Sequence, residues 1–173
     1  MDLATLIRNV PDFPKPGIQF KDISTLLLEP EAFRAIIDGW RERYAQRGIH
    51  AIVGMDARGF VFAGALAYAM SIPLVLARKK GKLPAETISE TFQLEYGADS
   101  VEIHADALKP GQRVLLVDDL LATGGTMAAV VRLVERLGAT VEEIAFVVEL
   151  PPLKGRTALT GYTVHSLIEF MVD

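Results

Sequence analysis

Cysteine is absent from this chain of 173 residues, so it can form no disulfide, thiolate zinc site or thiol nucleophile. The longest apolar stretch, Phe60 to Met70, is shorter than the roughly 20 residues that a membrane helix needs. The opening Met-Asp-Leu also lacks the basic and then apolar pattern of a signal peptide. We therefore expect a cytoplasmic protein that binds no membrane.

Positive charge is also scarce, because 22 Asp and Glu outnumber 18 Lys and Arg. Nonspecific nucleic-acid binding depends on an excess of basic residues, so we expect no nucleic-acid partner and only a local anion site. The three histidines are scattered without the spacing of metal ligands, and we assign them no role.

What the chain does contain is material for a core, since half of its residues are hydrophobic and 23% are charged. No internal repeat or Gly/Ser-rich linker divides it, so residues 1–173 are interpreted as a single domain. Helical and strand patterns alternate along most of the chain. We expect helices over 30–47, 59–70 and 126–137, and strands over 50–55, 74–77, 113–117 and 144–148. This order predicts an α/β fold, a parallel sheet flanked by helices on both faces.

Two segments interrupt the alternation. Polar and apolar residues alternate over 88–96 and 100–104, which predicts an exposed antiparallel hairpin that turns around Gly97-Ala98-Asp99. Near the N-terminus, Pro11, Pro14, Pro16 and Gly17 argue against regular structure through Ile18.

The most informative stretch runs from Val114 to Met127, where an apolar strand leads into two carboxylates, a glycine pair and a helix. Gly124 and Gly125 remove two β-carbons, so the backbone can curl around an anion. The unpaired N–H groups at the start of the following helix favour a phosphate monoester there. Neither the P-loop motif nor the dinucleotide-binding glycine pattern occurs.

Asp118 and Asp119 are adjacent carboxylates at the end of this strand, where mutual repulsion and desolvation make them costly unless they gain a partner. A ribose diol or a magnesium ion held through water would satisfy them. The alternative is that the pair merely caps a turn and that the glycines form a tight loop.

The stretch from Val114 to Thr126 resembles the phosphoribosyl-diphosphate signature of the type I phosphoribosyltransferases. Further segments resemble the same family in the same order, so the resemblance covers nearly the whole chain. These segments are 11–24, 54–60, 78–84, 94–97 and 149–156.

The resemblance implies a 5-phosphate site at Ala122, Thr123, Gly124, Gly125 and Thr126, with Asp118 and Asp119 at the ribose. It implies that Ala57 and Arg58 bind the pyrophosphate. The basic run over 78–82 contains Gly81 and directly precedes the hairpin, so we interpret it as part of a mobile segment that neutralises the diphosphate, with Lys79 and Lys82 favoured. The alternative is a solvated charged face. The alternative for Arg58 is a surface ion pair with Asp56.

The resemblance also assigns the hairpin, within residues 79–104, as a flexible flap whose Glu95 acts on a purine nitrogen. On periodicity alone, Glu95 is simply exposed to solvent. Residues 1–28 would form a hood in which Phe20 stacks on the base and Lys21 contacts it through its main chain. Phe20 could equally be an ordinary core residue.

The implied activity is transfer of the 5-phosphoribosyl group from phosphoribosyl diphosphate to a purine, adenine, giving AMP and pyrophosphate. Mg²⁺ is the implied cofactor, held mainly through the substrate and by no protein ligand that we can name. A homodimer is expected from the family. Two alternatives stay open: a transferase for another nucleobase, and a catalytically silent sensor of phosphoribosyl diphosphate.

Overall fold

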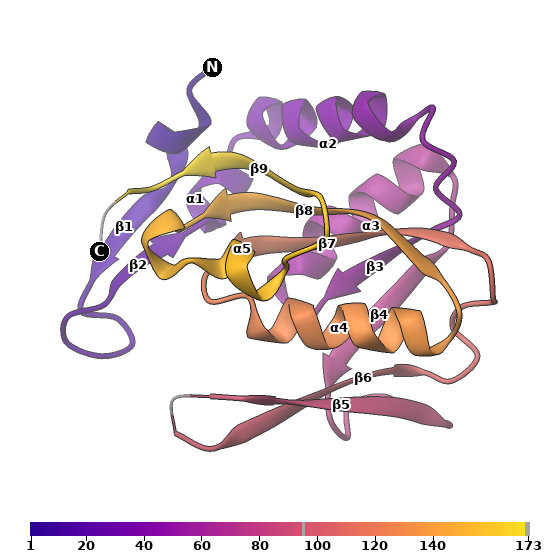
Figure 1. The fold of residues 1–173 in the computed structure, drawn as a ribbon. Helices are drawn as coiled ribbons and strands as arrows, with labels where there is room; N and C mark the ends of the chain where they lie inside the picture. Colours follow the sequence, from indigo (N-terminus) through magenta and orange to yellow (C-terminus); the bar gives the residue numbers. More distant parts are fainter. Residues whose placement is uncertain (95, 172–173) are drawn as a thin grey trace.

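The computed structural model describes residues 1–94 and 96–171, and its centre is a seven-stranded sheet of strand order β5-β6-β4-β3-β7-β8-β9 (Figure 1). The strands are β3 (Ala51–Met55), β4 (Leu74–Lys79), β5 (Thr87–Gln93), β6 (Ala98–His104), β7 (Arg113–Leu121), β8 (Thr140–Glu149) and β9 (Val164–Glu169). The helices are α1 (Ser24–Leu27), α2 (Pro30–Tyr44), α3 (Arg58–Met70), α4 (Gly125–Arg136) and α5 (Gly155–Ala158), with 3-10 turns at Leu3–Leu6 (η1) and Pro151–Leu153 (η2). A separate antiparallel pair, β1 (Arg8–Pro11) and β2 (Gln19–Asp22), completes the chain.

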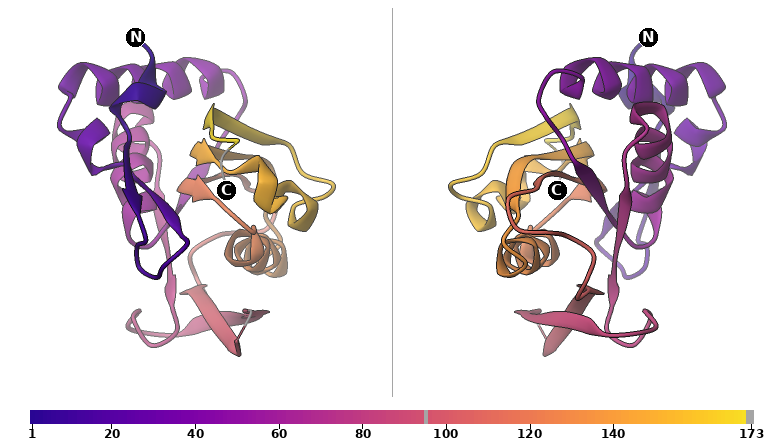
Figure 2. Two further views of the ribbon diagram at one scale, coloured as in Figure 1. Left: turned by 90° about the vertical axis from the view of Figure 1, so that its left-hand side faces the viewer. Right: turned by 90° about the vertical axis from the view of Figure 1, so that its right-hand side faces the viewer.

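The predicted α/β class is confirmed: β4, β3, β7, β8 and β9 run parallel, and β5 and β6 pair antiparallel at one edge. Helices cover both faces, with α2 and α3 on one and α4 on the other (Figure 2). Alternate residues of a central strand point to opposite faces. In β7, Leu116 accordingly packs on the α4 side and Leu115 and Val117 on the α2 and α3 side.

The helix boundaries follow local chemistry. Pro30 occupies the first turn of α2, where its missing N–H removes no hydrogen bond, and the segment after the helix turns at Gly48 with φ +67°. Its buried residues Ile36, Ile37, Trp40 and Tyr44 follow the helical period.

Four expectations about the elements were wrong. The hairpin turn lies before Ala98 rather than around 97–99, because Phe92 pairs with Asp99 and Gln93 with Ala98. The hairpin is also only partly exposed: β6 pairs with β4 as well as with β5, which buries Val101 and Ile103.

Strand β7 extends four residues beyond the predicted end at Val117, so both aspartates lie within the sheet. It is longer because pairing with β8 continues to Leu121 opposite Glu149. Near the N-terminus, Pro11 ends a regular strand instead of excluding one, and only 12–18 form a loop. Proline is tolerated at such a strand end because little of the hydrogen-bond ladder depends on it.

The carboxyl ends of β3, β7 and β8 point toward the side of the molecule where the β1–β2 ribbon lies, on the left of Figure 1. The end of β5 and the start of β6 lie on this side too. In parallel α/β sheets, ligands bind beyond the carboxyl ends of the strands. Within the described residues, no helix is long and apolar enough to cross a bilayer.

Candidate active site

The loop between β7 and α4 forms a small anion-sized cavity of about 120 Å³. Every residue from Ala122 to Met127 lines it, together with Asp118, Leu120, Leu121 and Phe146. Gly124 caps α4 at φ +84°, a left-handed conformation that glycine adopts without steric cost. The first N–H groups of a twelve-residue helix therefore border the cavity, and the helix dipole adds partial positive charge.

Asp118 and Asp119 are adjacent near the end of β7, and their carboxyl groups lie close enough for the charge of one to act on the other. Asp118 borders the loop cavity and is partly exposed, whereas Asp119 is 4% exposed. Burial and the adjacent Asp119 charge raise the pKa of the Asp118 carboxyl well above its ordinary range. A cation or hydroxyl donors at this carboxylate would relieve that cost.

Arg58 begins α3 directly after the cis Asp56–Ala57 peptide bond, and its Nε lies 2.8 Å from Oδ2 of Asp119. This Oδ2 is buried and accepts no well-aligned hydrogen bond within the described parts of the chain. The guanidinium also lies 5.1 Å from the ring centroid of Phe20. The alternative pairing of Arg58 with Asp56 is wrong, because Asp56 pairs with Arg78 at 2.9 Å.

A second cavity of about 170 Å³ adjoins the first and shares Asp118 and Thr126 with it. Its other lining residues are Met55, Asp56, Ala77, Arg78, Lys79, Phe92, Ser100 and Val101. Lys79 also pairs with Asp99 at 3.0 Å. Lys82 is exposed and lines neither cavity.

Several of these lining residues were not predicted. Two of them carried a signal in the sequence: Asp56 is a carboxylate at a strand end, and Arg78 is the first member of the basic run. Their pairing with each other was not predicted. Phe92 and Ser100 had none, because only the pairing of β5 and β6 with the sheet brings them to the cleft.

The β1–β2 ribbon brings Phe20 to the same cleft. Phe20 packs edge-on against Phe13, with ring centroids 5.1 Å apart, and both line a groove of about 400 Å³ with Val10 and Asp22. Phe20 is only partly buried, so its ring remains available to a flat ligand. Lys21 points elsewhere: it is 9% exposed, and its Nζ donates to Asn9 Oδ1 at 2.9 Å.

The predicted site residues Ala57, Arg58, Asp118 and Asp119 thus share one edge of the sheet with the phosphate loop. Glu95, the predicted catalytic residue, lies outside the described residues. A metal-binding cluster of three or more His, Cys, Asp or Glu side chains is absent from 1–94 and 96–171.

Comparisons with known proteins agree with this arrangement. The family described as "Phosphoribosyl transferase domain" matches residues 23–169. An adenine phosphoribosyltransferase of Chloroflexus aurantiacus is 56% identical over 169 residues, covering 98% of both chains. The crystal structure of the Thermoanaerobacter pseudethanolicus adenine phosphoribosyltransferase superposes with a TM-score of 0.94 at 50% identity, covering 98% of both chains. The Saccharomyces cerevisiae enzyme, complexed with adenine and an imino-altritol bisphosphate, superposes with a TM-score of 0.91 at 39% identity, covering 96% of both chains.

A parallel sheet with a phosphate loop after an acidic strand, matched over most of its length, defines the class: the chain belongs to the phosphoribosyltransferase family. Within the family it groups with the adenine phosphoribosyltransferases, to which its full-length relatives belong. None of these relatives is described as a transferase for another nucleobase or as a silent sensor.

Proposed function

We propose that this chain transfers the 5-phosphoribosyl group of phosphoribosyl diphosphate to adenine, releasing AMP and pyrophosphate. The observation that carries the proposal is the continuity of the cleft. The loop cavity and the second cavity share Asp118, and Arg58 links Asp119 to Phe20. A phosphate, a ribose, a diphosphate and a flat base can therefore lie side by side.

The 5-phosphate occupies the loop, held by backbone N–H groups at the start of α4 and by the hydroxyls of Thr123 and Thr126. The ribose hydroxyls face Asp118 and Asp119, whose carboxylates accept hydrogen bonds. This assignment is supported by the raised pKa of Asp118, since hydrogen-bond donors or a cation stabilise its charged form.

The diphosphate lies toward Ala57 and Arg58, with Lys79 and Lys82 completing its charge neutralisation. Breaking the anomeric bond leaves positive charge on the ribose and negative charge on the leaving group. Preorganised cations therefore stabilise the transition state more than the ground state. The ion pairs of Arg58 with Asp119 and of Lys79 with Asp99 hold both cations before substrate arrives.

The carboxylates fit a magnesium ion that arrives with its substrate. Two aspartates and no third ligand among the described residues leave most of a six-oxygen shell to the diphosphate, the ribose and water. When bound, Mg²⁺ supplies charge neutralisation at the diphosphate oxygens. Asp118 and Asp119 are the residues that would hold it, directly or through water.

Adenine stacks on Phe20, with the main chain of Lys21 at the base edge. The groove lined by Phe20 and Phe13 supports this placement, as does the Lys21 ammonium, which is turned toward Asn9. Glu95 donates or accepts the proton at the imidazole nitrogen of the purine. Closure of a flap over 79–104 would keep water from the cationic sugar.

The test compares initial rates of pyrophosphate release with adenine, hypoxanthine and orotate, in the presence of phosphoribosyl diphosphate and Mg²⁺. We expect adenine to be strongly preferred. Glu95→Gln should lower kcat by about 10²-fold or more, the range of general acid–base catalysis, while phosphoribosyl diphosphate still binds. A wild-type kcat would remove Glu95 from the mechanism, and a preference for another base would overturn the proposed substrate.

We also propose that two chains associate through an apolar patch on α3 and β4, formed by Val61, Tyr68, Leu74 and Leu76. These side chains are 40%, 89%, 37% and 37% exposed. Monomers rarely leave such a cluster in water, and burying it against a second copy is favourable. Sedimentation of the wild type and of Tyr68→Glu tests this: the wild type should be a dimer and the variant shifted toward monomer. A monomeric wild type would refute it.

A further inference from the structure

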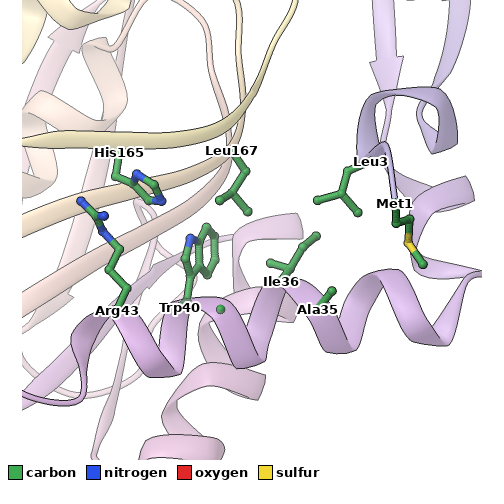
Figure 3. Close-up of a pocket in the computed structure, with 9 residues that line it drawn as sticks. Met1, Leu3, Ala35, Ile36, Trp40, Arg43, His165 and Leu167 are labelled. Carbon is green, nitrogen blue, oxygen red and sulfur yellow. The ribbon is translucent and has the colours of Figure 1, made fainter.

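A further cavity of ligand size lies outside the substrate cleft. It has a volume of about 400 Å³ and lies between α2, β9 and η1 (Figure 3). Its walls are Met1, Leu3, Ala35, Ile36, Gly39, Trp40, Arg43, His165 and Leu167. None of these residues lines the cavities of the active site. Its volume falls within the usual range for small-molecule sites, about 300–1,000 Å³.

The wall of this cavity carries an unpaired buried donor. Trp40 is 1% exposed, yet its Nε1–H finds no hydrogen-bond partner among residues 1–94 and 96–171. Only one other buried side-chain atom in those residues shares this state, Oδ2 of Asp119 in the substrate cleft. Because this nitrogen has almost no accessible surface, a ligand in the cavity would contact the indole ring rather than bond to the N–H.

Further hydrogen-bond donors lie at the same end of the cavity as the Trp40 nitrogen. Figure 3 shows the indole nitrogen of Trp40 on the edge of the ring that faces His165 and Arg43. Arg43 uses Nε and Nη2 to donate to Glu143, at 2.8 and 3.1 Å, and its Nη1 has no partner among the described residues. Burial and the Arg43 charge lower the pKa of His165, so its neutral ring offers one N–H.

The local charge favours an anion at this end. Arg43 belongs to an ion-pair network with Arg47, Arg113, Glu142 and Glu143, which holds one more positive than negative charge. The opposite end is apolar, formed by Leu3, Ile36 and Leu167. Figure 3 shows these three side chains on one side of the cavity, away from Arg43.

We propose that this cavity binds a small carboxylic acid with an apolar body. The carboxylate accepts from Arg43 and from the ring N–H of His165, and the body packs over the Trp40 ring, between α2 and the leucines of η1 and β9. A charged acceptor makes stronger hydrogen bonds than a neutral one, so the acid should be preferred over its amide. The proposal does not depend on the transfer reaction.

Trp40 is the only tryptophan in the chain, so one indole N–H resonance reports directly on the cavity. The experiment titrates ¹⁵N-labelled protein with 3-phenylpropanoate and, in parallel, with the matched neutral 3-phenylpropanamide. We expect the acid to shift the indole resonance until saturation, and the amide to bind about ten-fold more weakly or worse.

A matched pair of variants places the binding. A β-carbon on Gly39 would meet no atom within 4 Å, so Gly39→Leu should extend into the cavity without disturbing α2. Gly39→Ala gains similar helix propensity but leaves most of the space open. Gly39→Leu should abolish the shift and Gly39→Ala should retain it, with both variants keeping wild-type transferase rates.

Three results would overturn the proposal. An indole resonance that does not move with the acid would show that the cavity binds no such acid. Equally tight binding of the amide would exclude carboxylate recognition. Binding that survives in Gly39→Leu would place the acid elsewhere.

Discussion

Gly155, at the start of α5, supports the phosphate loop from behind, and its replacement by alanine gives the sharpest test of the proposed 5-phosphate site. A β-carbon there would lie 2.7 Å from Leu121 Cδ1 and even closer to the carbonyl oxygen of Ala122. Ordinary carbon contacts begin near 3.5 Å, so the loop must move by roughly 1 Å.

The size of the effect follows from this displacement. A misplacement of about 1 Å at a binding site can cost on the order of 10²-fold in rate. We therefore expect Gly155→Ala to lower kcat/KM for phosphoribosyl diphosphate by about 10- to 100-fold, with a much smaller change in KM for adenine. Overpacking should also cost about 1–3 kcal/mol of stability, which corresponds to a Tm lower by roughly 2–10 °C.

Steady-state kinetics with each substrate varied in turn measure the first effect, and thermal unfolding measures the second. Gly64→Ala is the matched control, because its β-carbon would meet nothing closer than Leu74 Cδ2 at 3.9 Å. A destabilised Gly155→Ala enzyme with a wild-type KM and kcat for phosphoribosyl diphosphate would refute a role for the loop in binding the phosphate.

Two further predictions concern the aspartate pair and the base. Because the folded-state pKa of Asp118 is raised, its ionised form opposes folding; this cost is absent below the ordinary value of 3.8, grows as pH rises from there to the folded pKa, and is constant above it. Asp118→Asn should therefore raise Tm at neutral pH, lose that gain in acid, and lower activity; an unchanged Tm across pH would contradict the burial argument. Phe20→Ala should raise KM for adenine by about ten-fold or more, since base stacking contributes about 1–3 kcal/mol, while Phe20→Tyr keeps the stacking. An equal loss for both variants would argue against stacking.

Local chemistry in the sequence determined much of this protein. The alternation of apolar strands and amphipathic helices predicted the parallel sheet, because helical and strand periods differ and each element must bury its apolar side. The turn at Gly124 and Gly125 before a helix predicted an anion site from backbone chemistry alone, as the residues that line it, apart from Phe146, lie in one stretch of the chain.

Only the tertiary structure decided which distant segments of the chain come into contact. Arg58 and Asp119 are separated by 61 positions, and nothing in the local pattern predicted that they, rather than Arg58 and Asp56, would pair. The extension of β7 through both aspartates depended on β8, and the burial of β6 on β4. The buried indole N–H of Trp40, which has no partner among the described residues, likewise lies where α2, β9 and η1 meet. Periodicity reports how a segment is solvated, but the identity of a partner is set by packing between elements, which no local pattern encodes.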